Sequence, residues 1–323
     1  MPILSIIYDV LPGAFPMISI KPALLGLSLA ALPAAALADT APLRVVATFS
    51  VIGDLVEQVA GGSASVELLA PMGAEVHEWE LIPSNFMALE SADVVFYNGL
   101  NLEEWIGQVN ATVTSGTPVV GLAEASAYPT LPIVTGDYAG EADPHLWMDP
   151  RAAADYVHVI AEVLGEARPE AAEDFAARAD AAAQDLNALH KELEETLSAI
   201  PEEQRLLITS EAAFIYFADA YGFEHDGIWG TNSEEEGTPR QIMRIVDLIQ
   251  ERRPAAIFWE STISDRHVRS VADETGVAIA GPLFVDSLSE AEGDAPDYAS
   301  MLRHNARLLA DTLGDADGTA SGR

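Results

Sequence analysis

Two series of short β-rich runs, separated by one long helical pattern, constrain the fold of this chain more than any other feature. The first series covers residues 43–48, 66–70, 93–98 and 118–122, and the second covers residues 205–209, 224–229, 255–260 and 277–280. Helical patterns follow the runs in each series, and such alternation is typical of βαβ units with mainly parallel sheets. We therefore predict an α/β protein with two lobes.

The segment between the two series predicts a single amphipathic helix, with Pro169 near its start and Pro201 just past its end. Its apolar residues recur every three or four positions, at Phe175, Ala179, Ala182, Leu186, Leu189, Leu193, Leu197 and Ile200. A helix of about 31 residues would be ~45 Å long, which is the length of a whole domain. We expect residues 169–200 to form a rigid strut between an N-terminal lobe, 39–168, and a C-terminal lobe, 201–323.

The first 38 residues have the pattern of a secretory signal peptide. Residues 17–21 resemble a short basic region, residues 22–32 are apolar, and Ala36-Leu37-Ala38 provides a small-x-small cleavage motif. The apolar run is shorter than the ~20 residues that a membrane-spanning helix needs. We expect cleavage after Ala38 and export of the mature chain.

The charge and cysteine content exclude several classes of partner and site. The chain carries a formal net charge of −35, so we expect no binding to nucleic acid or to anionic membrane surfaces. It has no cysteine, which excludes disulfides, thiolate metal ligands and a lipid-modified N-terminal cysteine. Export without a direct membrane anchor indicates a periplasmic location.

Four side chains that could bind a metal ion lie just past predicted strands, where open α/β sheets build their ligand sites. They are His77, His145, Glu211 and Asp286. The segment DPHLWMDP (143–150) frames His145 with two Asx-Pro-type turns, and a rigid frame suits a metal ligand because little ordering is required on binding.

Each of the four has a simpler interpretation that the residues alone leave open. His77 fits a solvated loop, and His145 fits an ordinary turn before a helix that starts near Arg151. Glu211 ends a strand and opens a helix, so it fits a helix cap. Asp286 fits a helix cap equally well.

The other five histidines are expected to have no ligand role. His158, His190 and His304 lie in helical patterns and His267 lies near a helix start, where solvated faces are the commonest explanation. His225, which we place at the end of a strand, is kept as a group that could support a ligand from behind.

Five segments, taken in order, closely resemble the metal-binding solute receptors of ABC importers. They are residues 71–80 (PMGAEVHEWE), 92–105 (ADVVFYNGLNLEEW), 143–150, 210–223 (SEAAFIYFADAYGF) and 281–290 (GPLFVDSLSE), and the resemblance covers about residues 43–313. It implies a metal ion held between two (β/α)4 lobes that one long helix joins. The implied ligands are His77, His145, Glu211 and Asp286, and the implied partners are a membrane permease and its cytoplasmic ATPase.

The third ligand position bears on the choice of metal. The resemblance implies that zinc receptors of this family have a histidine at the third ligand position and a histidine-rich loop before the second ligand. This chain has Glu211 at the third position and no histidine in residues 128–143. Carboxylate oxygen is a hard and potentially bidentate ligand, which favours Mn²⁺ or Fe²⁺ over tetrahedral Zn²⁺. We expect one divalent ion as cargo, with Mn²⁺ preferred and Zn²⁺ or Fe²⁺ as alternatives.

A metalloenzyme is the main rival of another class, because His77-Glu78 matches the start of the H-E-x-x-H zinc motif. The second histidine of that motif is missing, and four protein ligands would fill the shell that a catalytic metal keeps open. We therefore expect a monomeric receptor and no enzyme. A periplasmic metal chaperone or adhesin on the same scaffold remains an alternative.

Overall fold

The computed structural model describes residues 41–231 and 236–314, and these described residues belong to a single compact unit. The predicted signal peptide, residues 1–38, lies outside the described residues. Among the residues that are described, no helix combines the length and apolar character that crossing a membrane requires.

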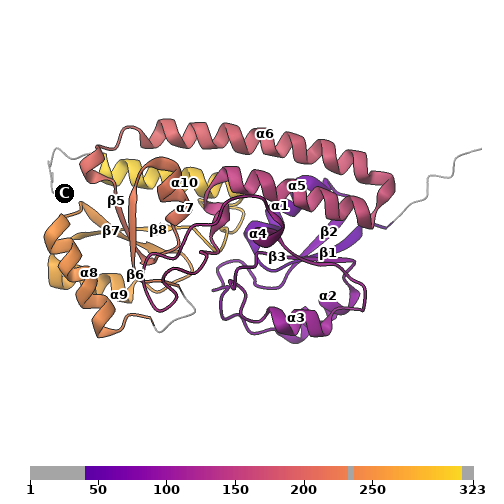
Figure 1. The fold of residues 1–323 in the computed structure, drawn as a ribbon, viewed down its shortest axis with the longest axis horizontal. Coiled ribbons are helices and arrows are strands. Elements are labelled where there is room, and N and C mark those ends of the chain that lie inside the picture. Colours follow the sequence, from indigo (N-terminus) through magenta and orange to yellow (C-terminus); the bar gives the residue numbers. More distant parts are fainter. Residues whose placement is uncertain (1–40, 232–235, 315–323) are drawn as a thin grey trace, which may run out of the picture. The chain divides into compact units, whose positions relative to one another are not determined.

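The first lobe contains a parallel sheet with the strand order β2-β1-β3-β4 (Figure 1). Its strands are β1 (Leu43–Ala47), β2 (Ala64–Leu68), β3 (Val94–Tyr97) and β4 (Val119–Gly121), and its helices are α1 (Ser50–Ala60), α2 (Pro83–Ser91), α3 (Ile106–Thr112), α4 (Leu122–Ala125) and α5 (Pro150–Ala167). Because all four strands run in one direction, their carboxyl ends meet at one edge of the sheet.

The second lobe repeats the alternation of strands and helices. Its elements are β5 (Leu206–Glu211), α7 (Ile215–Tyr221), β6 (Glu224–Trp229), α8 (Pro239–Arg252), β7 (Ala256–Glu260), α9 (Arg266–Thr275), β8 (Ala278–Leu283) and α10 (Tyr298–Leu313). Parallel ladders join β5 to β6 and β7 to β8, and β5 lies beside β7 although the two belong to separate hydrogen-bonded pairs. The predicted α/β class with parallel sheets and two lobes is confirmed.

The predicted linking helix is present as α6 (Ala172–Leu197), preceded by a 3-10 turn at Pro169–Ala171. Its apolar stripe is buried as the spacing predicts, at Phe175, Ala179, Ala182, Leu186, Leu189, Leu193 and Leu197. These side chains face both lobes, since α6 packs on α1 and α5 of the first lobe and on α7 and α10 of the second (Figure 1). At 26 residues the helix is shorter than the expected strut, and residues 169–200 remain our proposal for the linking segment.

Direct hydrogen bonds also join the two lobes. The loop that follows β8 is bonded to the first lobe at three points, from Trp147 Nε1 to the Val285 carbonyl at 3.1 Å, from Gly73 N to Ser287 Oγ at 2.6 Å and from Leu288 N to Ser50 Oγ at 2.9 Å. A single hydrophobic core runs through both lobes and includes α6. The helix is therefore one of several connections between the lobes.

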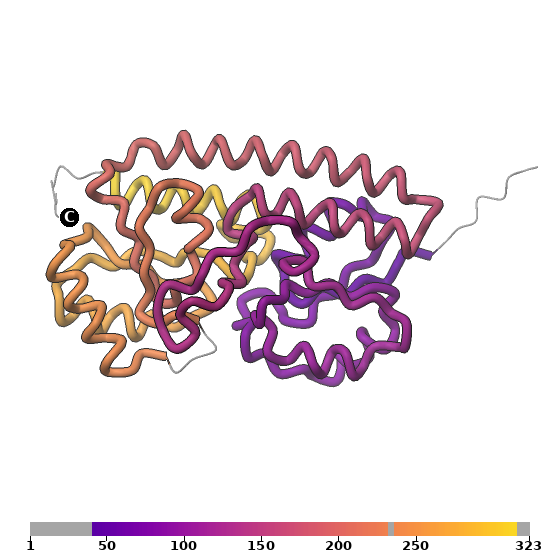
Figure 2. The backbone as a smooth tube through the Cα atoms, in the orientation of Figure 1, coloured from indigo at the N-terminus to yellow at the C-terminus, as the bar shows by residue number. Residues whose placement is uncertain are grey.

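The long segment between α4 and α5 provides a further connection. Residues 126–145 leave the first lobe and run beside the second, as the backbone trace shows (Figure 2). The Tyr216 hydroxyl of α7 accepts a hydrogen bond from Leu131 N at 3.0 Å and donates one to the Asp143 carbonyl at 2.8 Å. Tyr216 thus restrains this segment near both of its ends.

We predict that Leu189→Ala lowers the free energy of unfolding by ~2–5 kcal/mol, because it leaves a cavity under a buried leucine of α6. Gln184→Ala, at an exposed position of the same helix, should change it by less than ~0.5 kcal/mol. Urea denaturation of both variants measures the difference. Equal effects would contradict the packing of α6 described above.

Candidate metal centre

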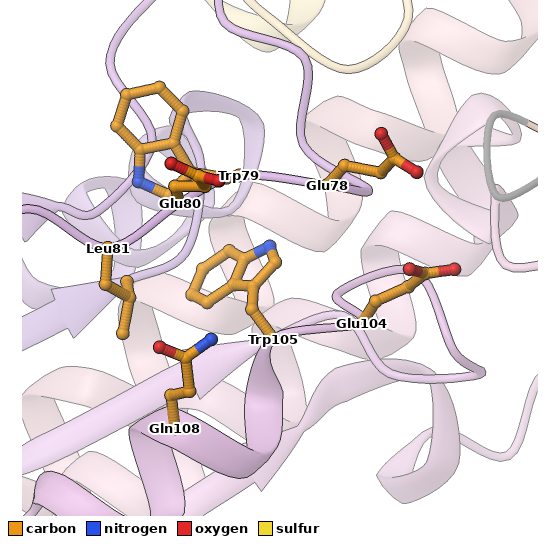
Figure 3. Close-up of a pocket in the computed structure, with 7 residues that line it drawn as sticks. All are labelled: Glu78, Trp79, Glu80, Leu81, Glu104, Trp105 and Gln108. Atoms are coloured by element: carbon orange, nitrogen blue, oxygen red, sulfur yellow. The ribbon is translucent and has the colours of Figure 1, made fainter.

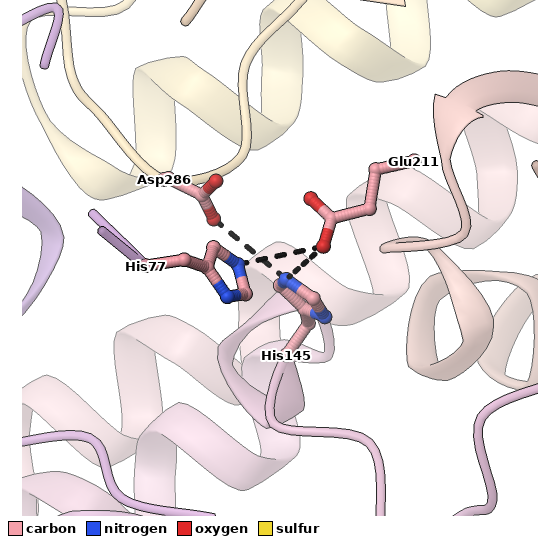
Figure 4. A group of neighbouring side chains, drawn as sticks. All are labelled: His77, His145, Glu211 and Asp286. Atoms are coloured by element: carbon pink, nitrogen blue, oxygen red, sulfur yellow. Dashed lines mark ion pairs between the residues drawn. The ribbon is translucent and has the colours of Figure 1, made fainter. Parts of the chain in front are cut away.

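The structure brings His77, His145, Glu211 and Asp286 together at one point (Figure 4). His77 lies in the loop after β2, His145 precedes the 3-10 helix Leu146–Met148, Glu211 is the last residue of β5, and Asp286 follows β8. All four are buried, and each offers one ligand atom within 4.8 Å of all the others. Metal–ligand bonds of ~2.0–2.3 Å place opposite ligands of one ion ~4–4.6 Å apart, so this spacing fits a single ion.

The ligand atoms face one another at distances that exceed most hydrogen bonds. Glu211 Oε1 lies 3.4 Å from His77 Nε2 and 3.7 Å from His145 Nε2, and Asp286 Oδ1 lies 3.8 Å from His145 Nε2. Among the described residues, His145 Nε2 and Asp286 Oδ1 have no hydrogen-bond partner. A buried polar atom without a partner costs ~1–3 kcal/mol, and a bound cation would satisfy both atoms.

His145 is held by the turn that its sequence predicts. Asp143 Oδ1 accepts from the backbone N of His145 at 2.9 Å and lies 3.0 Å from its Nδ1. This bond keeps a proton on Nδ1 and directs Nε2 toward the centre. Asp149 forms the second predicted turn, because its Oδ1 accepts from Arg151 N at 2.8 Å at the start of α5.

His77 is held by a loop that packs on the segment 98–105. Glu75 accepts from the backbone N of His77 at 2.9 Å, and Trp105 Nε1 donates to the Val76 carbonyl at 2.8 Å. The backbone N of Glu104 donates to the His77 carbonyl at 3.3 Å. With an exposed fraction of 0%, His77 is not the solvated residue that a lone loop histidine suggests.

A surface groove opens beside this loop (Figure 3). Three carboxylates and two indoles contribute to its lining, which consists of Glu78, Trp79, Glu80, Leu81, Glu104, Trp105 and Gln108. The groove contains none of the four clustered residues, and we assign it no ligand.

The helix-cap interpretations of Glu211 and Asp286 are wrong. The helix after Glu211 begins only at Ile215, and the helix after Asp286 begins at Tyr298, where Asp297 provides the cap. Glu211 therefore does not open a helix, and a helix N-terminus does not account for its position. Both side chains instead point toward the two imidazoles (Figure 4).

The remaining histidines differ in part from expectation. His158 is exposed as predicted, but His190, His267 and His304 are half-buried, and His190 Nδ1 lies 3.2 Å from the Tyr221 hydroxyl. These half-buried rings pack against neighbouring elements, which an isolated helical pattern cannot reveal. His225 lies near the start of β6, not at its end as predicted, and its Nε2 is 3.1 Å from Thr209 Oγ1.

Two further carboxylates of the site region were not singled out from the sequence. Asp143 lies within a recognised motif, and its role as the partner of His145 follows from its place two residues earlier. Glu260 ends β7 at the same sheet edge as Glu211, and its oxygens accept from the backbone N of Ser210 and of Glu211. The strand-end argument that selected Glu211 applies to Glu260 as well.

The protonation of the site is set by burial and by the carboxylates. Burial lowers the pKa of His77 well below its usual value, and the neighbouring His145 lowers it further. Burial also acts to lower the pKa of His145, but Asp143, Glu211 and Asp286 outweigh this effect and raise the pKa to about 10. Burial raises the pKa of Asp286 to about 7, against the opposing effect of His145. At neutral pH the His145 ring of the metal-free site is therefore an imidazolium, with a proton on both Nδ1 and Nε2.

Comparison with known proteins finds a family model and several relatives that match most of the chain. Residues 45–312 match the family model described as zinc-uptake complex component A, periplasmic. The manganese-binding lipoprotein MntA of Halalkalibacterium halodurans is 39% identical over 275 residues, which cover 85% of this chain and 90% of that protein. The iron-binding protein YfeA of Yersinia pestis is 39% identical over 277 residues, which cover 85% of this chain and 88% of that protein.

Solved structures agree with these relatives. The periplasmic zinc-binding protein TroA from Treponema pallidum superimposes with a TM-score of 0.77 at 30% identity, covering 85% of this chain and 99% of that chain. A manganese-bound S38A mutant of a periplasmic metal-binding protein from Candidatus Liberibacter asiaticus gives a TM-score of 0.76 at 28% identity, covering 83% of this chain and 98% of that chain.

We predict that metal binding at pH 8–9 releases about one proton per ion, because the pKa of His145 in the free site is about 10 and the ion binds the neutral ring, from which the Nε2 proton has been lost. Protons compete with the metal, so apparent affinity should fall about tenfold for each pH unit below 10. The fall should steepen below about pH 7, where Asp286 also takes up a proton.

Calorimetry in buffers of different ionisation enthalpy counts the released protons. Asp143→Asn is the matched control, because it removes a carboxylate that raises the pKa of His145, and it should reduce the count. A binding enthalpy that is the same in every buffer would disprove the predicted proton on His145.

Proposed function

This chain belongs to the family of periplasmic zinc-uptake components and related metal-binding receptors of ABC importers, and from that premise we propose that its cargo is one Mn²⁺ ion per chain. The ion binds between the lobes to His77, His145, Glu211 and Asp286. The receptor then delivers it to a membrane permease that a cytoplasmic ATPase drives. The observation that carries the choice of metal is the position of Glu211, whose Oε1 faces both imidazoles.

The ligand set favours manganese for reasons of charge and coordination number. Two carboxylates cancel the charge of a divalent ion, and two imidazoles with two potentially bidentate carboxylates offer up to six donor atoms. Mn²⁺ accepts such an oxygen-rich shell, whereas structural Zn²⁺ is almost always tetrahedral. The named relatives bind manganese, iron and zinc, so family membership alone does not select the metal.

Zinc and iron are the alternatives within the same function. The stability order of divalent ions places zinc above manganese at most nitrogen and oxygen sites, so purified protein should also bind zinc tightly. The preference for manganese therefore concerns the ratio of the manganese affinity to the zinc affinity, and Glu211 in the third ligand position sets this ratio.

A receptor role also fits the geometry better than catalysis does. Four protein ligands around one ion leave little room for the water or substrate that a catalytic metal binds. We propose that the protein performs no reaction on its cargo. We further propose that it works in the periplasm after cleavage of the predicted leader at Ala38.

We predict that Glu211→His shifts selectivity toward zinc. The change replaces a charged and potentially bidentate oxygen ligand with a neutral nitrogen, which leaves three imidazoles and one carboxylate, a set that suits tetrahedral zinc. The zinc-to-manganese affinity ratio should rise by at least about tenfold, the scale on which a lost hard ligand affects affinity. Competition titrations on metal-free protein measure it.

Glu211→Ala is the control for this experiment. Emptying the position should weaken both metals without completing a tetrahedral set, so its ratio should change less than that of Glu211→His. An unchanged ratio in Glu211→His would remove Glu211 from the ligand set. Recovery of zinc alone from the native periplasm would reject the choice of manganese but not the receptor function.

We also predict that metal loading produces only a small change in the arrangement of the lobes. The hydrogen bonds from Trp147 to Val285, Gly73 to Ser287 and Leu288 to Ser50 oppose wide opening, and α6 spans both lobes. X-ray scattering curves of the metal-free and manganese-loaded protein should nearly superimpose. A difference of several ångströms in the radius of gyration would contradict this prediction.

A further inference from the structure

Glu260 is a buried carboxylate that the proposed metal site does not use as a ligand. It is the last residue of β7, and its exposed fraction is 1%. In the second lobe β7 lies between β5, which ends in Glu211, and β8, after which Asp286 follows. Glu260 thus occupies the strand end between the two carboxylate ligands.

The two oxygens of Glu260 bind the backbone that carries Glu211. Oε2 accepts from Ser210 N at 3.2 Å, and Oε1 accepts from Glu211 N at 3.1 Å. Within the described residues, no backbone ladder joins β5 to β7, because the two strands belong to separate hydrogen-bonded pairs. The Glu260 side chain instead bonds the end of β7 to the backbone of β5. Because its two oxygens bind consecutive backbone N–H groups, the Glu260 side chain clamps the end of β5 to the end of β7.

The other side of Glu211 is also fixed. The Thr209 hydroxyl donates to the Glu211 carbonyl, and His225 Nε2 lies 3.1 Å from the same hydroxyl. Because the hydroxyl hydrogen is directed to the carbonyl, the tautomer of His225 that fits this contact has its proton on Nε2, and burial lowers the pKa of His225 to about 3, so the ring is neutral. Ala212 N donates to the Trp229 carbonyl at 3.0 Å. The backbone on both sides of Glu211 is therefore restrained, and on its N-terminal side the restraint comes from Glu260.

We propose that Glu260 is a positioning residue that aims the Glu211 carboxylate and thereby sets the preference for manganese over zinc. This inference rests on the proposed function. A bidentate carboxylate must be held in a narrow range of orientations, and groups that hold a ligand from behind commonly change metal affinity by about 10–100-fold. Zinc needs one oxygen from Glu211 in a tetrahedral shell, so it depends less on this orientation.

Glu103 offers a matched control in the first lobe. It is equally buried, and its oxygens accept from Asn98 N at 2.8 Å, Gly99 N at 3.1 Å and Thr48 Oγ1 at 2.8 Å. It thus caps the end of β3 in the way that Glu260 caps the end of β5. Glu103 thereby supports the segment 98–105, which packs on the His77 loop, so it stands behind a proposed imidazole ligand and not behind a proposed carboxylate ligand.

The test compares Glu260→Gln with Glu103→Gln and wild type by competition titration with Mn²⁺ and Zn²⁺. In Glu260→Gln the amide oxygen can accept one backbone N–H, but the amide nitrogen faces the other, which releases one side of the clamp. We expect the manganese-to-zinc affinity ratio to fall about tenfold, and the electron paramagnetic resonance spectrum of bound Mn²⁺ to change. Glu103→Gln should lose unfolding stability and weaken both metals alike, because Glu103 supports an imidazole that donates one nitrogen to either ion, so the manganese-to-zinc ratio should stay at the wild-type value.

A wild-type ratio and spectrum in Glu260→Gln would overturn the inference, because they would reduce Glu260 to a structural role. If Glu260→Gln does not fold, Glu260→Asp decides, since its shorter carboxylate cannot reach both backbone groups without moving β5, and its ratio should also fall. Glu211→Ala distinguishes a failure of the ligand role of Glu211 from a failure of the positioning role of Glu260. Unchanged affinities for both metals in Glu211→Ala would contradict the ligand role of Glu211. Weakened affinities in Glu211→Ala together with a wild-type ratio in the Glu260 variants would contradict only the positioning role.

Discussion

Two carboxylates and two imidazoles lie buried within 4.8 Å of one another, and this concentration of polar groups away from water is the constraint on which the rest of the structure depends. Desolvation opposes every charge in the site, and it accounts for the direction in which the pKa values of His77 and Asp286 move. A divalent cation offsets the desolvation cost, because it neutralises two negative charges and binds buried atoms that have no hydrogen-bond partner among the described residues. The scaffold must keep these groups together when the cation is absent, which requires rigidity from elements far from the centre.

That rigidity comes from restraints on the backbone behind each proposed ligand. Asp143 holds His145, the segment 98–105 holds the loop of His77, and Glu260 with Thr209 holds Glu211. The loop of Asp286 is bonded directly to the opposite lobe at its two neighbours, Val285 and Ser287. The ligands therefore belong to one connected body, in which α6 and a shared core join the two halves. Binding then requires little ordering of the chain, which preserves affinity for a weakly bound ion such as manganese.

The sequence predicted the elements well because periodicity reports burial on a local scale. The strands and the stripe of α6 from Phe175 to Leu197 follow directly from it. The strand-end rule selected all four clustered residues, although a long segment separates His145 from the end of β4. Prediction from the sequence failed where the outcome depended on distant partners. The helix-cap interpretation of Glu211 required a helix that begins at Ala212, whereas α7 begins at Ile215. His304 is half-buried by contacts outside its own helix, such as the one with the Pro282 carbonyl. Glu260 also ends a predicted strand, but the sequence does not show that β5 and β7 belong to separate hydrogen-bonded pairs. The contact of its carboxylate with the backbone of β5 therefore could not be predicted.

The two lobes contribute chemically unequal halves of the centre, with both imidazoles in the first lobe and both carboxylates in the second. A divalent ion that stayed with the first half alone would keep its full charge, whereas with the second half it would be neutralised. For the proposed ligand set, this asymmetry sets the order in which the ion leaves its ligands. The imidazoles are the first contacts that the ion can give up, and the carboxylates are the last. The transporter that empties the receptor must therefore offer the departing ion negative charge of its own, or deliver protons to Glu211 and Asp286, and a merely mechanical separation of the lobes would leave the cargo on the second one.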